Sequence, residues 1–249
     1  EMTSSLVGSE MCIRDRNNIT MEMLKDSVFF GVVISLLAYY AGMWLKKKFK
    51  LPIFNPLLIS IIITIVVLLC TKMDYQVYYS GAKYISYLLT PATICLAIPL
   101  YEQVSLLKKQ WKAVVGGIVT GVITSMLCIF AMCLIMGLGH TEYVTLLPKS
   151  ITTAIGMGVS EELGGYVTIT VAVIIITGVF GNIIGEVVCK IFRINEPIAK
   201  GLALGTSAHA IGTAKAMEMG EVEGAMSSLS VAVAGLLTVI VASVFSGLI

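Results

Sequence analysis

Long uncharged stretches alternate with short polar ones along the chain. Asp, Glu, Lys and Arg are absent from residues 28–45, 51–71, 84–101, 113–139, 163–185 and 224–249. A helix of about 20 apolar residues crosses the hydrocarbon core of a bilayer, and several of these stretches reach that length. The pattern predicts an all-α polytopic membrane protein with about six full spans. Residues 72–83 are expected to form a short polar link, and 113–139 an uninterrupted helix.

Composition and charge narrow the class of protein. Charged residues make up 13% of the chain, against about 25% in soluble proteins, and the mean hydropathy is +0.93. So few charges cannot cover a water-facing surface, which excludes soluble enzymes, nucleic-acid binders and secreted disulfide scaffolds. Net charge is only +2, but Lys and Arg gather at 46–50, 108–112 and 190–200. Such clusters mark cytoplasmic loops.

Three segments differ from the spans because they are interrupted or polar. Pro91 and Pro99 fall inside 84–101, Pro148 and a Ser/Thr cluster fall inside 145–163, and 199–220 is rich in Gly, Ser and Thr. A proline breaks a helix, and freed backbone groups persist at membrane depth only in protein or beside water. We therefore expect interrupted or re-entrant helices. The positive clusters favour a crossing 84–101 and a re-entrant 145–163, without settling the matter.

The interrupted segments also match one another. Pro91 aligns with Pro148, and Ala154-Ile155-Gly156 aligns with Ala210-Ile211-Gly212. Each copy precedes a long apolar span, so the sequence predicts internal, inverted repeats over 84–249, with 21–83 as scaffold spans of the same membrane domain, 21–249. Residues 1–20 are interpreted as a non-native or disordered extension. Paired broken helices in repeats are typical of secondary transporters that bind substrate near the midplane.

The broken helices supply the candidate site. A helix start exposes unpaired N–H groups and a positive dipole end, which favour anions. Hydroxyls gather there, and together they suit a small carboxylate. The candidate substrate-binding residues are Thr90, Thr93, Lys149, Ser150, Thr152, Thr153, Thr206, Ser207 and Thr213. Alternatively, the hydroxyls bond only their own helix backbone, and Lys149 extends to the membrane interface rather than neutralising a substrate.

Titratable residues are the candidates for coupling. His209 could carry a proton, or it could simply be hydrogen-bonded among packed helices. Glu162 and Glu218 are candidates for a proton or cation site, or solvated helix ends. We expect no enzyme activity, metal or cofactor: an intramembrane hydrolase is disfavoured because no intramembrane Asp is present to orient the histidine.

Several blocks resemble the LrgB/CidB family. They are 55–60 (NPLLIS), 89–101 (LTPATICLAIPLY), 148–153 (PKSITT), 201–216 (GLALGTSAHAIGTAKA) and 221–229 (EVEGAMSSL). The resemblance implies a multi-pass protein of the bacterial cytoplasmic (inner) membrane, usually paired with a holin-like LrgA/CidA protein. The family is described as antiholin-like, modulating murein hydrolase activity and cell lysis. Related proteins are linked to pyruvate uptake, and the plastid glycolate/glycerate translocator carries a similar domain.

Two functions follow as hypotheses. The first is a secondary transporter that moves small monocarboxylates such as pyruvate, lactate or glycolate by alternating access, coupled to a proton. The alternative is an antiholin-like regulator that acts through an LrgA/CidA-type partner without moving a substrate. In either case we expect a lipid-embedded homodimer with no nucleic-acid partner.

Overall fold

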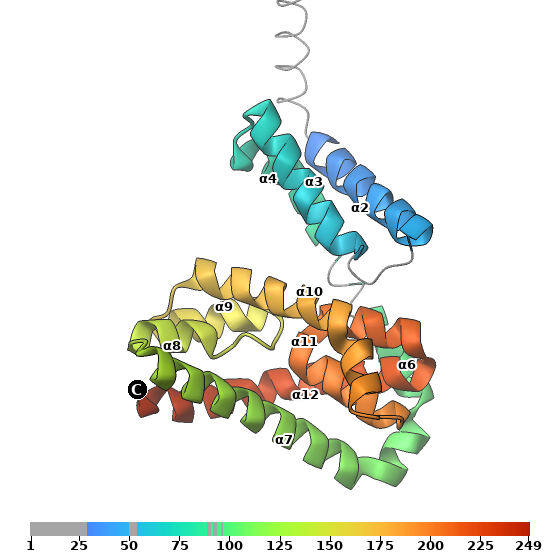
Figure 1. Cartoon of the computed structure of the whole chain (residues 1–249), viewed down its shortest axis with the longest axis vertical. Coiled ribbons are helices and arrows are strands. Elements are labelled where there is room, and N and C mark those ends of the chain that lie inside the picture. Colours follow the sequence, from blue (N-terminus) through green and yellow to red (C-terminus); the bar gives the residue numbers. More distant parts are fainter. Residues whose placement is uncertain (1–28, 50–53, 89–90, 92–93, 96) are drawn as a thin grey trace, which may run out of the picture. The chain divides into compact units, whose positions relative to one another are not determined.

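The computed structural model describes residues 29–49, 54–88, 91, 94–95 and 97–249, and the elements in these ranges are helices without any strand. Figure 1 shows their course along the chain. The chain divides into two compact units, residues 1–92 and 93–249, which are described separately. The predicted all-α membrane protein is confirmed. The extension at 1–20 lies outside the described residues.

The first unit holds three helices: α2 (Phe29–Phe49), α3 (Pro56–Thr71) and α4 (Tyr75–Ser86). Asn55 begins α3, since its Oδ1 accepts from the backbone N–H of Leu57 at 2.8 Å while Pro56 takes the first helical position. The α2 and α4 helices pack closely, and the hydroxyls of Ser35 and Tyr78 lie 2.8 Å apart.

Helix α4 corrects the prediction of a polar link at 72–83. Asp74 caps its first turn by accepting from the N–H of Gln76 at 2.8 Å. A Cβ on Gly31 of α2 would collide with the backbone of α4, so the two helices touch at main-chain distance. A capped start and a close helical partner therefore stabilise a helix that hydropathy alone does not reveal.

The second unit is built on three long apolar helices, α7 (Val104–Met136), α10 (Val167–Ile191) and α12 (Glu221–Phe245). Together with α2 they are the helices in the described ranges that are long and apolar enough to cross a membrane. Shorter elements complete the unit: α6 (Ala97–Glu102), α8 (His140–Leu146), α9 (Thr153–Glu162), α11 (Pro197–Met219) and η1 (Ser246–Leu248).

Two of the predicted segments agree with expectation in their continuity. The segment 84–101 is not one helix, because α4 ends at Ser86 and α6 begins at Ala97. Residues 89–90, 92–93 and 96 between them lie outside the described residues. The helix predicted at 113–139 is uninterrupted as far as Met136, and α7 begins earlier, at Val104. Its kink, at Gln110 with φ/ψ of −119° and 21°, lies before the predicted range.

Helices α8 and α9 form a hairpin that begins and ends at one end of the unit. It follows the last residue of α7 and precedes the first residue of α10. The Thr145 hydroxyl oxygen accepts from the N–H of Tyr166 at 2.8 Å, and the Thr170 hydroxyl donates to Ser160 Oγ at 2.7 Å. Meanwhile the turn between the helices reaches Ser125, near the middle of the uncharged part of α7, 113–136. The segment 145–163 is thus re-entrant.

Helix α11 is a second hairpin, folded at Ala208 and His209. These residues have φ/ψ of −130°/16° and 42°/−141°, which reverses the chain. A Cβ on Gly212 would lie 2.6 Å from the carbonyl oxygen of Leu204, so 210–219 runs back along 197–207. The fold lies inside 199–220, the small and polar segment in which an interrupted or re-entrant helix was expected.

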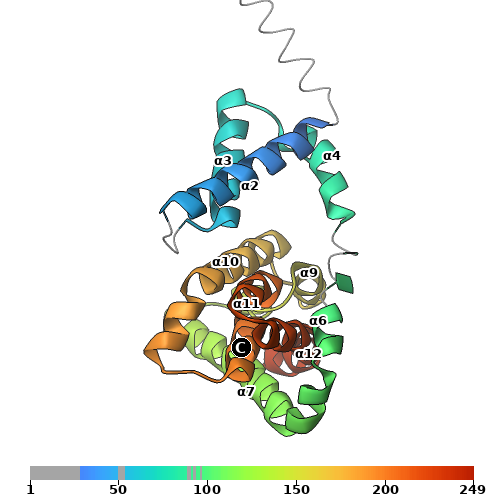
Figure 2. The ribbon, with the colours of Figure 1, turned by 90° about the vertical axis from the view of Figure 1, so that its right-hand side faces the viewer.

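Helix α11 lies among α7, α10 and α12, as Figure 2 shows. Small residues permit these approaches: a Cβ on Gly185 of α10 would collide with Leu204, and one on Gly201 would lie 2.9 Å from Met226 of α12. Both ends of α11 lie where α10 ends, because α11 begins there and Lys215 near its far end pairs with Glu186 at 2.8 Å. The two hairpins therefore enter from opposite ends of the unit.

Candidate functional site

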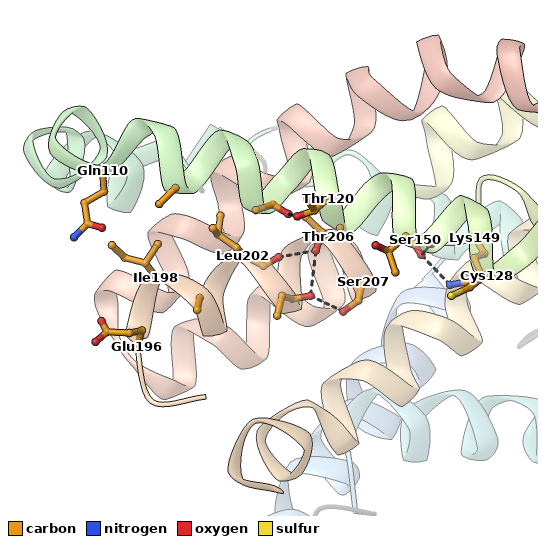
Figure 3. A pocket seen from close by; sticks show the side chains of 17 residues that line it. Gln110, Thr120, Cys128, Lys149, Ser150, Glu196, Ile198, Leu202, Thr206 and Ser207 are labelled. Carbon is orange, nitrogen blue, oxygen red and sulfur yellow. Dashed lines mark hydrogen bonds between the residues drawn. The ribbon is translucent and has the colours of Figure 1, made fainter. Parts of the chain in front are cut away.

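A cavity of about 1000 Å³ lies where the two hairpins approach α7, and Figure 3 shows the side chains around it. Its walls come from three places: the face of α7 from Gln110 to Cys128, the turn of the α8–α9 hairpin, and the first half of α11. We call it the main cavity. Its volume lies within the range of small-molecule sites.

The hairpin turn contributes a cation to the main cavity. Lys149 Nζ donates to Ser150 Oγ at 3.0 Å, and Ser150 Oγ lies 3.2 Å from Ser125 Oγ on α7. No carboxylate in the described part of the chain forms an ion pair with Lys149; the pairs there involve Glu186 and Glu218. An ammonium has three donors, so Lys149 can still bind an anion.

The first half of α11 supplies two predicted hydroxyls. Thr206 and Ser207 line the main cavity, but each donates to its own helix, at 2.7 Å to the carbonyl of Leu202 and at 2.6 Å to that of Ala203. Backbone bonding and cavity lining thus coexist here. Because a hydroxyl oxygen keeps its acceptor capacity and can rotate its proton, both remain able to contact a solute.

Helix α7 contributes polar residues that the sequence analysis missed. Thr120, Thr124 and Ser125 line the main cavity, although 113–139 looked like an ordinary span. The signal is positional: with Gly117 and Gly121 they form one small, polar face at helical spacing. A Cβ on Gly121 would lie 3.0 Å from Thr206 Oγ1, so α11 packs against that face of α7.

The main cavity runs toward one end of the unit. Gln110 and Glu196 lie at one extremity, and Lys149, Ser150 and Cys128 at the other (Figure 3). Gln110 sits among Lys108, Lys109 and Lys112, and Glu196 follows the end of α10. We call this the basic end. The cation thus lies beside the uncharged part of α7, near Ser125 and Cys128, at the far extremity of a cavity that extends to the basic end.

Three predicted hydroxyls lie elsewhere. Thr152 and Thr153 begin α9 but are not among the residues lining the main cavity. Thr213 is fully buried between α11 and α12, where its Oγ1 donates to the His209 carbonyl at 3.1 Å and lies 2.8 Å from Ser227 Oγ. Because its hydroxyl is shared between two helices, Thr213 holds the second half of α11 in place.

His209 forms the turn of the α11 hairpin. Its ring packs against α10 and does not line the main cavity. Its Nε2 lies 3.0 Å from the Ile174 carbonyl oxygen, which can only accept, so the ring donates. A Cβ on Gly178 would lie 2.6 Å from that nitrogen. Asn182 adds a second link from α10, donating to the Ile211 carbonyl at 2.7 Å.

The predicted carboxylates are remote from the main cavity. Glu162 is exposed at the end of α9. Glu218 lies in a charged cluster at the basic end, 3.5 Å from Lys215 Nζ, which also pairs with Glu186. Thr90 and Thr93 lie outside the described residues. Of the predicted set, the structure brings Lys149, Ser150, Thr206 and Ser207 together around one cavity.

Comparison with known proteins places the chain in a family. A sequence model described as the LrgB-like family matches residues 35–248. The antiholin-like protein LrgB of Bacillus cereus (strain B4264) and that of Bacillus anthracis (strain CDC 684 / NRRL 3495) are each 43% identical over 218 residues, which is 87% of this chain and 95% of theirs. No solved structure matches. This multi-pass membrane chain belongs to the LrgB-like family.

Proposed function

We propose that the protein has an antiholin-like role in the cytoplasmic membrane of a bacterium. Relatives named antiholin-like protein LrgB, 43% identical over nearly their whole length, support this proposal above the alternatives. In this role the chain restrains murein hydrolase activity and lysis together with a second, holin-like membrane protein of the LrgA/CidA type. It acts without enzymatic chemistry.

Lysis measurements test the antiholin-like role. In a host that carries the chain and its holin-like partner, deletion of the chain should speed autolysis and raise murein hydrolase activity. The wild-type chain should restore both. Unchanged lysis after deletion would count against the role.

A second function, transport of small monocarboxylates, is favoured by one observation. Lys149 and the hydroxyls of Ser150, Thr206 and Ser207 line one cavity beside the uncharged part of α7. A charge at that depth has a ligand, a partner or water, and a carboxylate satisfies both an ammonium and hydroxyl donors.

The arrangement of the hairpins supports a carrier rather than a static site. We infer that α7 with α8–α9, and α10 with α11, are two inverted repeats, each a span followed by a hairpin that enters from the end where the span finishes. Inverted repeats allow alternating access around a fixed site. With the basic end cytoplasmic, the cavity described here is open inward. His209 remains the candidate for a coupling proton, and the first unit for a homodimer contact.

Uptake into proteoliposomes tests the carrier. Labelled pyruvate, lactate and glycolate are offered with and without a pH gradient. Saturable accumulation that depends on the gradient supports a proton-coupled carrier. If none of the three accumulates saturably, the chain is not a carrier of these acids, and the antiholin-like role stands without it.

A further inference from the structure

A second cavity, of about 410 Å³, lies on the other side of the first half of α11. Lys149, Ala203 and Ser207 line both this cavity and the main one. The cation therefore stands at the boundary between two spaces, one facing α7 and one facing α10.

The two spaces differ in chemistry. Near Lys149 the main cavity is bordered by hydroxyls from α7 and from the hairpin turn. The second cavity is instead bordered largely by hydrocarbon from α10 and α11, including Ile176, Phe180, Ile184 and Leu204. Among the residues of α10 that line the second cavity, Thr177 is the one that carries a hydroxyl. That hydroxyl makes no hydrogen bond within the described part of the chain.

We propose that the second cavity holds the aliphatic tail of a monocarboxylate whose carboxylate is bound by Lys149. We call it the tail pocket. This inference rests on the carrier proposal and refines its substrate class, from acids of two or three carbons to acids with a short apolar chain.

The positions of the hydroxyls favour the second cavity over the main cavity as the place for the tail. A carboxylate on Lys149 lies beside the hydroxyls of Ser150 and Ser207, and the Ser207 hydroxyl donates to it once its proton turns away from the Ala203 carbonyl. A tail directed into the main cavity would cover hydroxyls on α7 without bonding them, which costs free energy. The same tail placed in the tail pocket lies against Ile184, Phe180 and Leu204. There it covers mainly apolar surface, which is favourable.

Chain length is the observable. Each methylene that enters an apolar site raises affinity about fourfold. Because Ile176 and Phe180 are largely exposed and leave the pocket partly open, affinity should rise by up to about fourfold at each step from acetate through propanoate and butanoate to pentanoate. A site without a tail pocket gives affinities that are level or fall along the series.

Equilibrium binding of these four labelled acids and of glycolate to the full chain in nanodiscs tests the proposal. Nanodiscs with the Lys149→Met chain give the blank for partition into lipid. Thr177→Phe places a ring in the tail pocket and should flatten the series. Thr168→Phe makes the same substitution on an exposed position of α10 outside the pocket and should leave the rise intact.

The outcomes separate the two proposals. Glycolate and acetate binding with a level or falling series overturns the tail pocket and leaves the carrier standing. Absence of binding by every acid overturns both. A wild-type rise that Thr177→Phe leaves unchanged also overturns the tail pocket, since the tail then lies elsewhere. If Thr177→Phe does not fold, the wild-type series with its Lys149→Met blank decides alone.

Discussion

Ser125 on α7 and Ser150 in the hairpin turn lie side by side, with 3.2 Å between their Oγ atoms. This contact brings a loop that starts and ends at one end of the unit to the middle of a long span. It predicts that Ser125→Cys/Ser150→Cys forms a disulfide on mild oxidation, because the two side chains already meet. In a Cys128→Ala background, which removes the neighbouring thiol, loss of two maleimide-reactive thiols by mass spectrometry measures it.

The matched control for that crosslink is Thr120→Cys/Ser150→Cys. Thr120 lies on the same face of α7, where it bonds the Gly116 carbonyl at 2.7 Å, more than a turn from Ser125. This pair should retain both free thiols. Equal crosslinking of the two pairs would contradict the depth assigned to the hairpin turn.

Removal of the charge at Lys149 should strongly weaken carboxylate binding. A hydrogen bond to a charged group is worth about 1.5–3 kcal/mol, so Lys149→Met should weaken affinity about 10- to 150-fold. Lys149→Arg should retain most of it. Lys112→Met, on an exposed lysine at the basic end, is the control and should bind as the wild type does. Calorimetric titration of the purified proteins gives the affinities.

A side chain at Gly121 should obstruct the main cavity. A Cβ there already approaches Thr206 Oγ1 to 3.0 Å, so Gly121→Leu forces α7 and α11 apart at a cost of about 1–3 kcal/mol and fills the space beside them. Uptake should fall about tenfold or more. Gly116→Leu is the same change on the same helix with open space around it. Comparable loss in both variants would show that bulk on α7, rather than the cavity, matters.

The buried hydroxyl pair between α11 and α12 should stabilise the fold. Thr213→Val keeps the shape of the side chain but removes the bonds to the His209 carbonyl and to Ser227. The loss should be about 0.5–2 kcal/mol. A double-mutant cycle with Ser227→Ala, followed by unfolding in detergent, should give coupling between the two sites. Strict additivity would mean that the pair contributes nothing beyond its members.

The sequence predicted the breaks better than the path of the chain. Pro148 and the small residues around His209 indicate where helices stop, since proline and crowded hydroxyls act locally. That α11 doubles back depends on contacts from elsewhere: His209 to the Ile174 carbonyl, and Gly212 against Leu204. No local pattern encodes those contacts, so the sequence left open whether this segment is an interrupted or a re-entrant helix, and the structure has a hairpin.

The candidate site was predicted in part for a similar reason. Lys149 and Ser207 stood out because they lie in the interrupted segments, where hydroxyls gather within an otherwise apolar chain. Thr120 and Thr124 did not, because the average hydropathy of α7 conceals a narrow polar face. Thr213 carried the expected chemistry, but it lies on the second half of α11, where it faces α12. The direction in which a helix runs thus decides which hydroxyls reach the cavity. The composition of a segment does not reveal that direction.

Binding of labelled pyruvate to the wild-type and Lys149→Met proteins, side by side in nanodiscs, tests the site most directly. We expect saturable binding to the wild type, competition by glycolate and lactate, and loss of that binding in Lys149→Met with the helical content unchanged. Equal binding by the two proteins, or none by the wild type, would contradict the assignment of the main cavity as a carboxylate site.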